Sequence, residues 1–284
     1  MRRRTGTAGP SCHLPRRGAD RADLVAELNG RPADLTQVTA LALINYGHYT
    51  SMRVDDQRVC GLSLHLERLM RDCRRVFDTD LDPDRVRYLI RHALAGISRS
   101  IVVRVTVFDP ALELRHPGAD AEPHILITTR PAAQTPLPAL RLQSIPYRRE
   151  MPDVKHVGLF GTLRHRRIAQ RNGFDDALFT DADTVISEAA TSNIGFIDGD
   201  RIVWPQADVL TGVTMRLINQ IRGGHVLTAP ISLGQLTDVD AVFATNAATG
   251  VRPISAIDGF PCSDENPTLA LLRKQYASLP TERL

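Results

Sequence analysis

Lysine is scarce in this sequence, and one of its two lysines stands in the short segment MPDVKHVG. The chain has 35 basic residues, of which only Lys155 and Lys274 are lysines. Arginine keeps its proton in proteins, whereas a desolvated lysine can lose its proton, attack a carbonyl and form a Schiff base. A composition that favours arginine explains Lys274, which we expect on the surface of a terminal helix, and it explains Lys155 equally well. Lys155 is therefore a candidate for imine chemistry that needs further support.

Three later segments have residue types that suit an anion or a polar ligand. LTGVTMRL places the N–H groups of Val213 and Thr214 at a helix start, where the helix dipole favours phosphate. The small, polar run TNAATG over residues 245–250 lets the backbone approach a ligand closely. In SEAATSN, Glu188 lies among small residues between two expected strands. A helix cap, a turn and a solvated carboxylate are the ordinary explanations, so none of the three defines a site alone.

The order of these features resembles that of the class IV pyridoxal-phosphate enzymes, which have fold type IV. Lys155 is followed by Glu188 in the pattern E-x-x-x-S-N and then by L-x-G-V-T, and HLERL over residues 65–69 resembles the family's first-domain motif. The resemblance covers roughly residues 26–260. It implies a two-domain α/β (α+β) fold like that of D-amino acid aminotransferase. The family contains branched-chain aminotransferases, D-amino acid transaminases and aminodeoxychorismate lyases.

The resemblance also implies a role for individual residues. Lys155 would be the catalytic residue, forming a Schiff base with pyridoxal 5'-phosphate and then shuttling a proton. Glu188 would keep the pyridine nitrogen protonated, and Arg68 would clamp the phosphate. The residues expected to bind the cofactor are Arg68, Lys155, Glu188, Asn193, Val213, Thr214 and Ala247. Those expected to contact the substrate are Tyr49, Thr50, Arg104 and Ala248, and no metal site is expected.

Details near the lysine leave the reaction open. Aminotransferases of this family usually carry a tyrosine five residues after the lysine, where this chain has Phe160. Lys155-His156 and Asn246-Ala247 are typical of the lyase branch. We predict an aminotransferase that moves an amino group between an amino acid or amine and a 2-oxo acid. The alternatives are a lyase that eliminates pyruvate from a chorismate-derived substrate, and a non-catalytic binding module, which would need neither Lys155 nor Glu188.

Composition and charge restrict the class of protein and its partners. Hydrophobic residues make up 43% and charged residues 24% of the chain, as in soluble globular proteins. The net charge of +3 is concentrated in residues 1–21, so the body shows no nucleic-acid footprint. No apolar run is long enough to span a membrane. The four scattered cysteines indicate a reducing cytoplasm. The resemblance implies a homodimer.

The elements that must position these residues alternate between strands and helices on both sides of a linker. We expect an Arg-rich, disordered extension over residues 1–22, a small domain over 23–130, a proline-rich linker over 131–140 and a larger domain over 141–284. Apolar spacing predicts helices over 62–77, 82–97, 161–173 and 211–224. Alternating, β-branched residues predict strands over 101–108, 124–130, 176–187 (two strands), 193–205 (a hairpin) and 240–259 (two strands).

Overall fold

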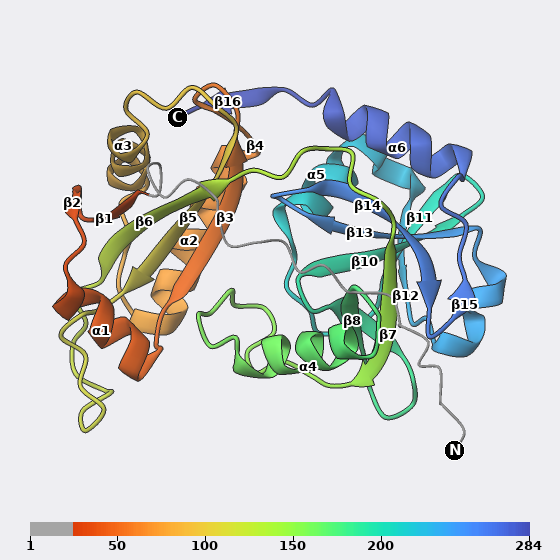
Figure 1. Cartoon of the computed structure of the whole chain (residues 1–284), viewed down its shortest axis with the longest axis horizontal. Helices are drawn as coiled ribbons and strands as arrows, with labels where there is room; N and C mark the ends of the chain where they lie inside the picture. The colour runs from red at the N-terminus through yellow and green to blue at the C-terminus, as the bar shows by residue number, and fades with distance from the viewer. Residues whose placement is uncertain (1–24) are drawn as a thin grey trace, which may run out of the picture.

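Two separate β-sheets, each covered by helices, form the two halves of the molecule (Figure 1). The computed structural model describes residues 25–284, so the predicted extension over residues 1–22 lies outside the described part of the chain. The mixture of strands and helices confirms the α/β fold class expected from the sequence. The N-terminal half is the smaller one, and the chain leaves it through residues 132–139.

The smaller half is a five-stranded antiparallel sheet in the order β2-β1-β6-β5-β3, with α2 and α3 against it. Its elements are β1 (Ala26–Leu28), β2 (Arg31–Pro32), α1 (Leu35–Ile44), β3 (His48–Val54), β4 (Arg58–Cys60), α2 (Leu62–Phe77), α3 (Pro83–Ala93), β5 (Ile101–Phe108) and β6 (His124–Pro131). The predicted helix over 62–77 is confirmed as α2, and the strands over 101–108 and 124–130 are confirmed as β5 and β6.

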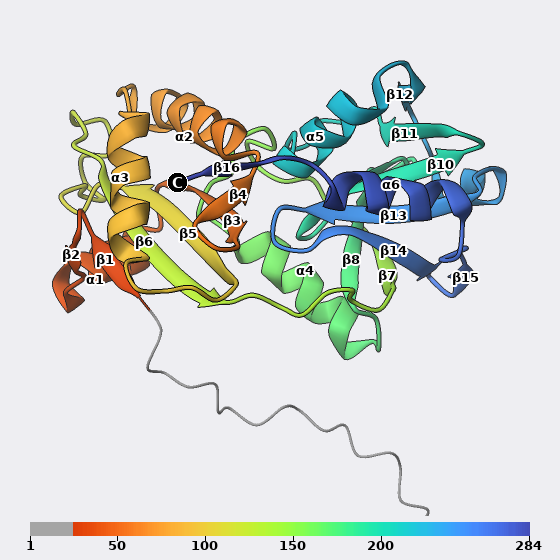
Figure 2. The same cartoon turned by 90° about the horizontal axis from the view of Figure 1, so that it is seen from above.

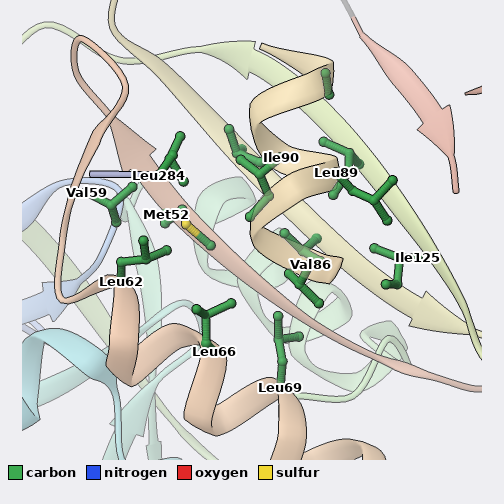
Figure 3. Close-up of a cluster of buried hydrophobic side chains, with 14 of the residues drawn as sticks. Met52, Val59, Leu62, Leu66, Leu69, Val86, Leu89, Ile90, Ile125 and Leu284 are labelled. Carbon is green, nitrogen blue, oxygen red and sulfur yellow. The ribbon is translucent and has the colours of Figure 1, made fainter. Parts of the chain in front are cut away.

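The hydrophobic core of this half lies between α2, α3 and the sheet (Figure 3). Leu62, Leu66 and Leu69 recur at helical spacing on α2, and each is at most 5% exposed. They face Met52 of β3, whose alternation buries every second side chain of that strand. Burial of each such leucine contributes about 1.5–3 kcal/mol, so this packing fixes α2 firmly under β3.

The larger half is a nine-stranded sheet that partly closes on itself. Its elements are β7 (Leu140–Pro146), α4 (Phe160–Arg171), β8 (Asp176–Thr180), β9 (Ile186–Ala189), β10 (Ser192–Asp198), β11 (Arg201–Pro205), α5 (Val213–Arg222), β12 (Val226–Ala229), β13 (Ala241–Asn246), β14 (Gly250–Ile257), β15 (Phe260–Pro261) and α6 (Pro267–Ala277), with 3-10 turns at Gly223–His225 and Leu233–Asp238. Because β9 pairs with both β8 and β10, the strands from β10 through β14 and β7 to β9 form a ring.

The C-terminus returns to the smaller half. After α6, β16 (Thr281–Arg283) pairs with β4, as the view from above also shows (Figure 2). Leu284 is 4% exposed and its N–H donates to the carbonyl of Gln57 at 3.0 Å. The chain therefore connects the two halves twice, through residues 132–139 and again before β16.

Helix α1 was not predicted from the sequence. Its residues LTQVTALALI are apolar on most sides and lack an amphipathic stripe, and none of them is buried. Asp34 caps the helix, since its side chain accepts from the N–H of Gln37 at 2.9 Å. Local capping rather than core packing therefore defines this helix.

The described residues 25–284 contain no helix that is long and apolar enough to cross a membrane. In the same range no group of three or more histidine, cysteine or acidic side chains is placed to hold a metal ion.

Candidate functional site

The segment that carries Lys155 belongs to the larger half in chain order but is held by the smaller half. The carbonyl of Lys155 accepts from the N–H of Tyr49 at 2.9 Å, and the N–H of Lys155 donates to Oδ2 of Asp72 at 3.1 Å. The next residue of this segment, His156, forms an antiparallel bridge with His48 of β3. Asp72 is fully buried on α2. Strand β3 and helix α2 together fix the backbone position of the lysine.

The Lys155 side chain enters a cavity of about 360 Å³ between the two halves. Its Nζ lies 4.9 Å from the centre of the Tyr49 ring. Burial, helped by the positive charges of Arg68 and Arg149, lowers the pKa of Lys155 to about 7, and Glu188 opposes this shift. An amine with this pKa is substantially unprotonated near neutral pH and can act as a nucleophile.

Because the pKa of Lys155 is lowered in the folded protein, the free energy of unfolding of the apoprotein should depend on pH. The unfolded chain binds a proton on Lys155 up to its ordinary pKa of 10.5, whereas the folded chain releases it near pH 7. The free energy of unfolding should therefore rise with pH between 7 and about 10 for the wild type relative to Lys155→Met, by at most ~1.4 kcal/mol per pH unit.

Urea unfolding of both apoproteins at pH 7, 8 and 9 measures this difference. Lys274→Met controls for the loss of an exposed lysine. A constant gap between wild type and Lys155→Met across the three pH values would contradict a lysine that is buried as the free amine.

Two acidic residues, Glu188 on β9 and Asp176 on β8, line the cavity, and Glu188 is paired with an arginine. Burial raises the pKa of Glu188, and Arg149 opposes this with an ion pair of 3.2 Å between Nη1 and Oε1. Arg149 also donates to the carbonyls of Pro152 and Val154, which flank the lysine segment. Arg149 therefore connects Glu188 to the segment of Lys155. The sequence did not identify Arg149, because one arginine among so many carries no signal.

The start of α5 forms one end of the cavity. The helix begins at Val213, and no side chain in the described part of the chain caps its N-terminus, so the first N–H groups are available to a ligand. Asn193 shapes the approach to this helix, because its amide donates to the carbonyl of Leu210 at 2.7 Å and accepts from the N–H of Gly212 at 3.1 Å. Any side chain at Gly212 would collide with Oδ1 of Asn193. The hydroxyl of Thr214 lies 3.3 Å from that of Tyr276.

The loop after β13 is folded around Asn246. Oδ1 of Asn246 accepts from the N–H groups of Ala248 and Thr249, both at 3.0 Å, which gives the loop a tight turn. Ala247 and Ala248, expected to contact the cofactor and the substrate, line the cavity, but the N–H of Ala248 is already used within the turn. Next to this loop, the hydroxyl of Thr245 is buried and has no hydrogen-bond partner among residues 25–284.

Strand β3 turns alternate side chains toward the cavity and away from it. Tyr49 and Ser51 line the cavity, whereas Thr50, predicted as a substrate contact, is fully buried on the opposite face. Arg104, the other predicted substrate contact outside the lining, stacks over Tyr49 with its guanidinium carbon 3.7 Å from the ring centre. Thr50 therefore cannot contact a ligand in the cavity directly. Arg104 does not line the cavity but contacts Tyr49, which does.

The remaining predicted site residues lie together around the cavity. They are Tyr49, Arg68, Lys155, Glu188, Asn193, Val213, Thr214, Ala247 and Ala248. Sequence analysis missed Arg130, Arg166 and Arg252, which also line the cavity. Phe160 is 80% exposed at the start of α4 and is not part of the lining.

Fold and site together define an enzyme of fold type IV, and comparison with known proteins identifies the family. The model of the family "Amino-transferase class IV" matches residues 47–257. The chain therefore belongs to the class IV aminotransferases, enzymes whose cofactor is pyridoxal 5'-phosphate.

Solved structures share the fold over most of the chain. A branched-chain aminotransferase from Thermoproteus uzoniensis with norvaline has a TM-score of 0.78 and 21% identity, and the match covers 89% of this chain and 93% of that one. The branched-chain amino acid aminotransferase from Escherichia coli has a TM-score of 0.78 and 18% identity over 91% of this chain and 94% of that one. At this level of identity, the similarity shows the fold alone.

Curated relatives match over shorter segments. Branched-chain-amino-acid aminotransferase 1, mitochondrial, of Arabidopsis thaliana is 33% identical over 112 residues, which are 37% of this chain and 29% of the relative. D-alanine aminotransferase of Listeria monocytogenes is 26% identical over 132 residues, 44% of this chain and 45% of the relative. The matched part of the chain thus spans less than half the length of each of these relatives.

The residues present fit pyridoxal 5'-phosphate. Nε of Arg68 and the hydroxyl of Thr245 are buried without hydrogen-bond partners in the described part of the chain, as expected of groups that await an anion. The uncapped start of α5 adds N–H donors. A free amine at Lys155 and a carboxylate at Glu188 complete the set. Lys155 would hold the aldehyde, Glu188 the ring nitrogen, and Arg68 with α5 the phosphate.

Proposed function

We propose that this protein is a pyridoxal-phosphate-dependent aminotransferase that moves an amino group between an amino acid and a 2-oxo acid. The observation that carries the proposal is the cavity in which the low-pKa Lys155 faces the Arg149-paired Glu188. A module that only binds a ligand needs neither a free amine nor a buried carboxylate held by a buried arginine. The class IV family match supports the same chemistry.

Each residue of the cavity has a definable task in this reaction. The bound cofactor supplies an electron-accepting ring that stabilises negative charge at the substrate Cα. Lys155, free of its proton, would hold the aldehyde of the cofactor and would later take up the proton that leaves the substrate Cα and deliver it to C4′. Glu188 would accept a hydrogen bond from the protonated ring nitrogen, and Arg149 favours the ionised form that this bond would need.

Four further lining residues support a substrate with a carboxylate and an aliphatic side chain. Arg130 and Arg252 line the cavity, and neither makes an ion pair with a described residue. Nε of Arg252 donates to the carbonyl of Pro138 at 2.6 Å, which leaves its two terminal guanidinium nitrogens available to a carboxylate. Leu159 and Leu163 line the same cavity with aliphatic side chains. Together with the relatives named above, this supports branched-chain amino acids as the substrates.

Absorbance of the purified protein with pyridoxal 5'-phosphate, followed by borohydride reduction and peptide mapping, tests the proposal. We expect one covalent adduct, on Lys155. Incubation of the loaded protein with leucine, valine, isoleucine or D-alanine should release the corresponding 2-oxo acid, fastest from a branched-chain amino acid. An adduct confined to Lys274 would overturn the enzyme assignment, and release of pyruvate from aminodeoxychorismate alone would favour the lyase.

We also propose that the protein is a homodimer located in the cytoplasm. Helix α1 supports the dimer, because Leu35 and Leu43 are 82% and 81% exposed and no residue of the helix is buried. Leu43→Glu should shift the molar mass in light scattering from that of a dimer toward that of a monomer, whereas Thr39→Glu, with its side chain bonded to the helix backbone, tests whether charge alone has this effect. A wild-type protein that stays monomeric at high concentration would contradict the proposed dimer. The proposed location in the cytoplasm is tested separately, by cell fractionation.

A further inference from the structure

We propose that Thr50 and His65 are positioning residues that hold the Arg68 guanidinium in the orientation needed to bind a phosphate monoester. In this arrangement His65 acts as a neutral hydrogen-bond acceptor. The inference rests on the proposed function, because it takes the phosphate of the cofactor as the ligand of Arg68. Neither Thr50 nor His65 lines the cavity, so both act through Arg68.

The three residues meet in a buried layer between β3 and α2. Thr50 points from the inner face of β3 toward α2, and His65 and Arg68 lie one turn apart on α2. Thr50 and His65 are 0% exposed and Arg68 is 6% exposed. Buried polar groups at this depth are costly unless each is hydrogen-bonded, so their mutual contacts determine how they lie.

The direction of the hydrogen bonds follows from the chemistry of the groups. Arginine has no acceptor, so Nη2 of Arg68 donates to the hydroxyl of Thr50. The hydroxyl has one proton, which it donates to Nδ1 of His65 at 2.7 Å. Nη2 of Arg68 also lies 3.4 Å from the same Nδ1, so a proton on Nδ1 would place two donors against each other. We therefore infer that His65 carries its proton on Nε2, which is buried without a hydrogen-bond partner among the described residues.

The charges around His65 favour the same neutral form. Burial lowers the pKa of His65 well below its ordinary value, and the positive charges of Arg68 and Lys155 lower it further. A protonated His65 would have no acceptor nitrogen for the hydroxyl of Thr50, and its positive charge would repel Arg68. The neutral ring thus keeps the chain of hydrogen bonds from Arg68 through Thr50 in one direction.

Arg68 has no acidic partner that could orient it instead. No carboxylate of the described residues lies within ion-pair distance of it, and the nearby Asp72 is engaged by Arg71 and by the N–H of Lys155. Only Nη2 of its three guanidinium nitrogens has a hydrogen-bond partner among the described residues, and Nε is buried without one. Thr50 and His65 therefore hold one nitrogen and leave the others for an anion.

Thr50→Val removes the hydroxyl at nearly constant volume, and Thr50→Ser is the matched control that keeps it. We expect the dissociation constant for pyridoxal 5'-phosphate to rise about tenfold or more in Thr50→Val, the effect of losing one hydrogen bond to a charged group. The affinity for pyridoxal, which lacks the phosphate, should change less than about twofold, as should both affinities in Thr50→Ser. His65→Leu should behave like Thr50→Val, and His65→Asn, whose Oδ1 can replace Nδ1, should recover most of the affinity.

Fluorescence titration of the apoproteins with pyridoxal 5'-phosphate and with pyridoxal measures the two affinities. Thermal unfolding identifies any variant that fails to fold, and Thr50→Ser and His65→Asn are then compared with the wild type. An equal loss of affinity for both compounds would show a general structural role and overturn the proposal, as would unchanged affinities in Thr50→Val.

Titration with inorganic phosphate, followed by 31P NMR, separates this proposal from the proposed function. It needs no reaction at Lys155. Weaker phosphate binding by Thr50→Val than by Thr50→Ser supports the positioning role even if no adduct forms on Lys155, an outcome that would reject the aminotransferase alone. Equal phosphate binding in both variants rejects the positioning role even if the adduct forms.

Discussion

Lys155→Arg should abolish amino transfer while leaving the protein folded. Arginine keeps a positive charge at this position but neither loses its proton nor attacks a carbonyl, so the nucleophile and the proton acceptor are lost together. The structure places this residue in the cavity with a pKa of about 7, where only a lysine can supply a free amine. We expect the rate of 2-oxo acid formation to fall by at least about 10⁴-fold.

Lys274→Arg is the matched control, because Lys274 is the other lysine of the chain and is exposed on α6. It should retain the rate of the wild type. Rates measured by coupled assay, together with cofactor content from absorbance, distinguish lost chemistry from lost binding. A Lys155→Arg protein with more than a few per cent of the wild-type rate would show that the reaction does not depend on this amine.

Glu188→Gln should reduce the turnover number by about 10²–10³-fold with a smaller effect on cofactor content. The amide keeps the shape of the side chain but cannot stabilise a proton on the ring nitrogen, so the ring accepts electrons less readily. Loss of the carboxylate also leaves Arg149 buried without its ion-pair partner. We therefore expect a lower melting temperature as well as slower turnover.

Glu188→Gln/Arg149→Met separates these two effects. Removal of both charges should recover part of the melting temperature, because no buried charge is left alone, but it should not recover turnover. Glu27→Gln, which alters a carboxylate on β1 outside the cavity lining, controls for loss of an acidic side chain. A turnover number for Glu188→Gln within threefold of the wild type would remove Glu188 from the mechanism.

The sequence predicted the main elements well where periodicity was strong. Helix α2 has apolar residues at regular helical spacing and was predicted over its full range, 62–77. Helix α1 was missed because its apolar residues follow no single face. The pairing of β16 with β4 was also missed, since it joins short segments that are far apart in the chain and carry no pattern.

The candidate site was predicted to the extent that its residue types are chemically distinctive. A lysine in an arginine-rich chain and an acidic residue among small ones could be identified, and Lys155 and Glu188 do line one cavity. Which face of β3 carries Thr50 depends on strand register, and a shift by one residue exchanges the faces. Arg149 and Asp72 were missed because their importance comes from contacts with residues far away in the chain. Arg149 pairs with Glu188 within the larger half, and Asp72 contacts Lys155 across the two halves.

The anchoring of Lys155 on β3 and α2 has a consequence for dissecting the protein. A fragment of residues 141–284 would contain Lys155, Glu188 and all of α5, so its sequence alone would suggest that it is sufficient for activity. It would lack Tyr49 and Asp72, the two residues that hold the lysine backbone on either side. The reactive amine is thus encoded in one half and aimed by the other, so neither half is a catalytic unit by itself. Complementation of separately produced halves would restore activity only by restoring that contact.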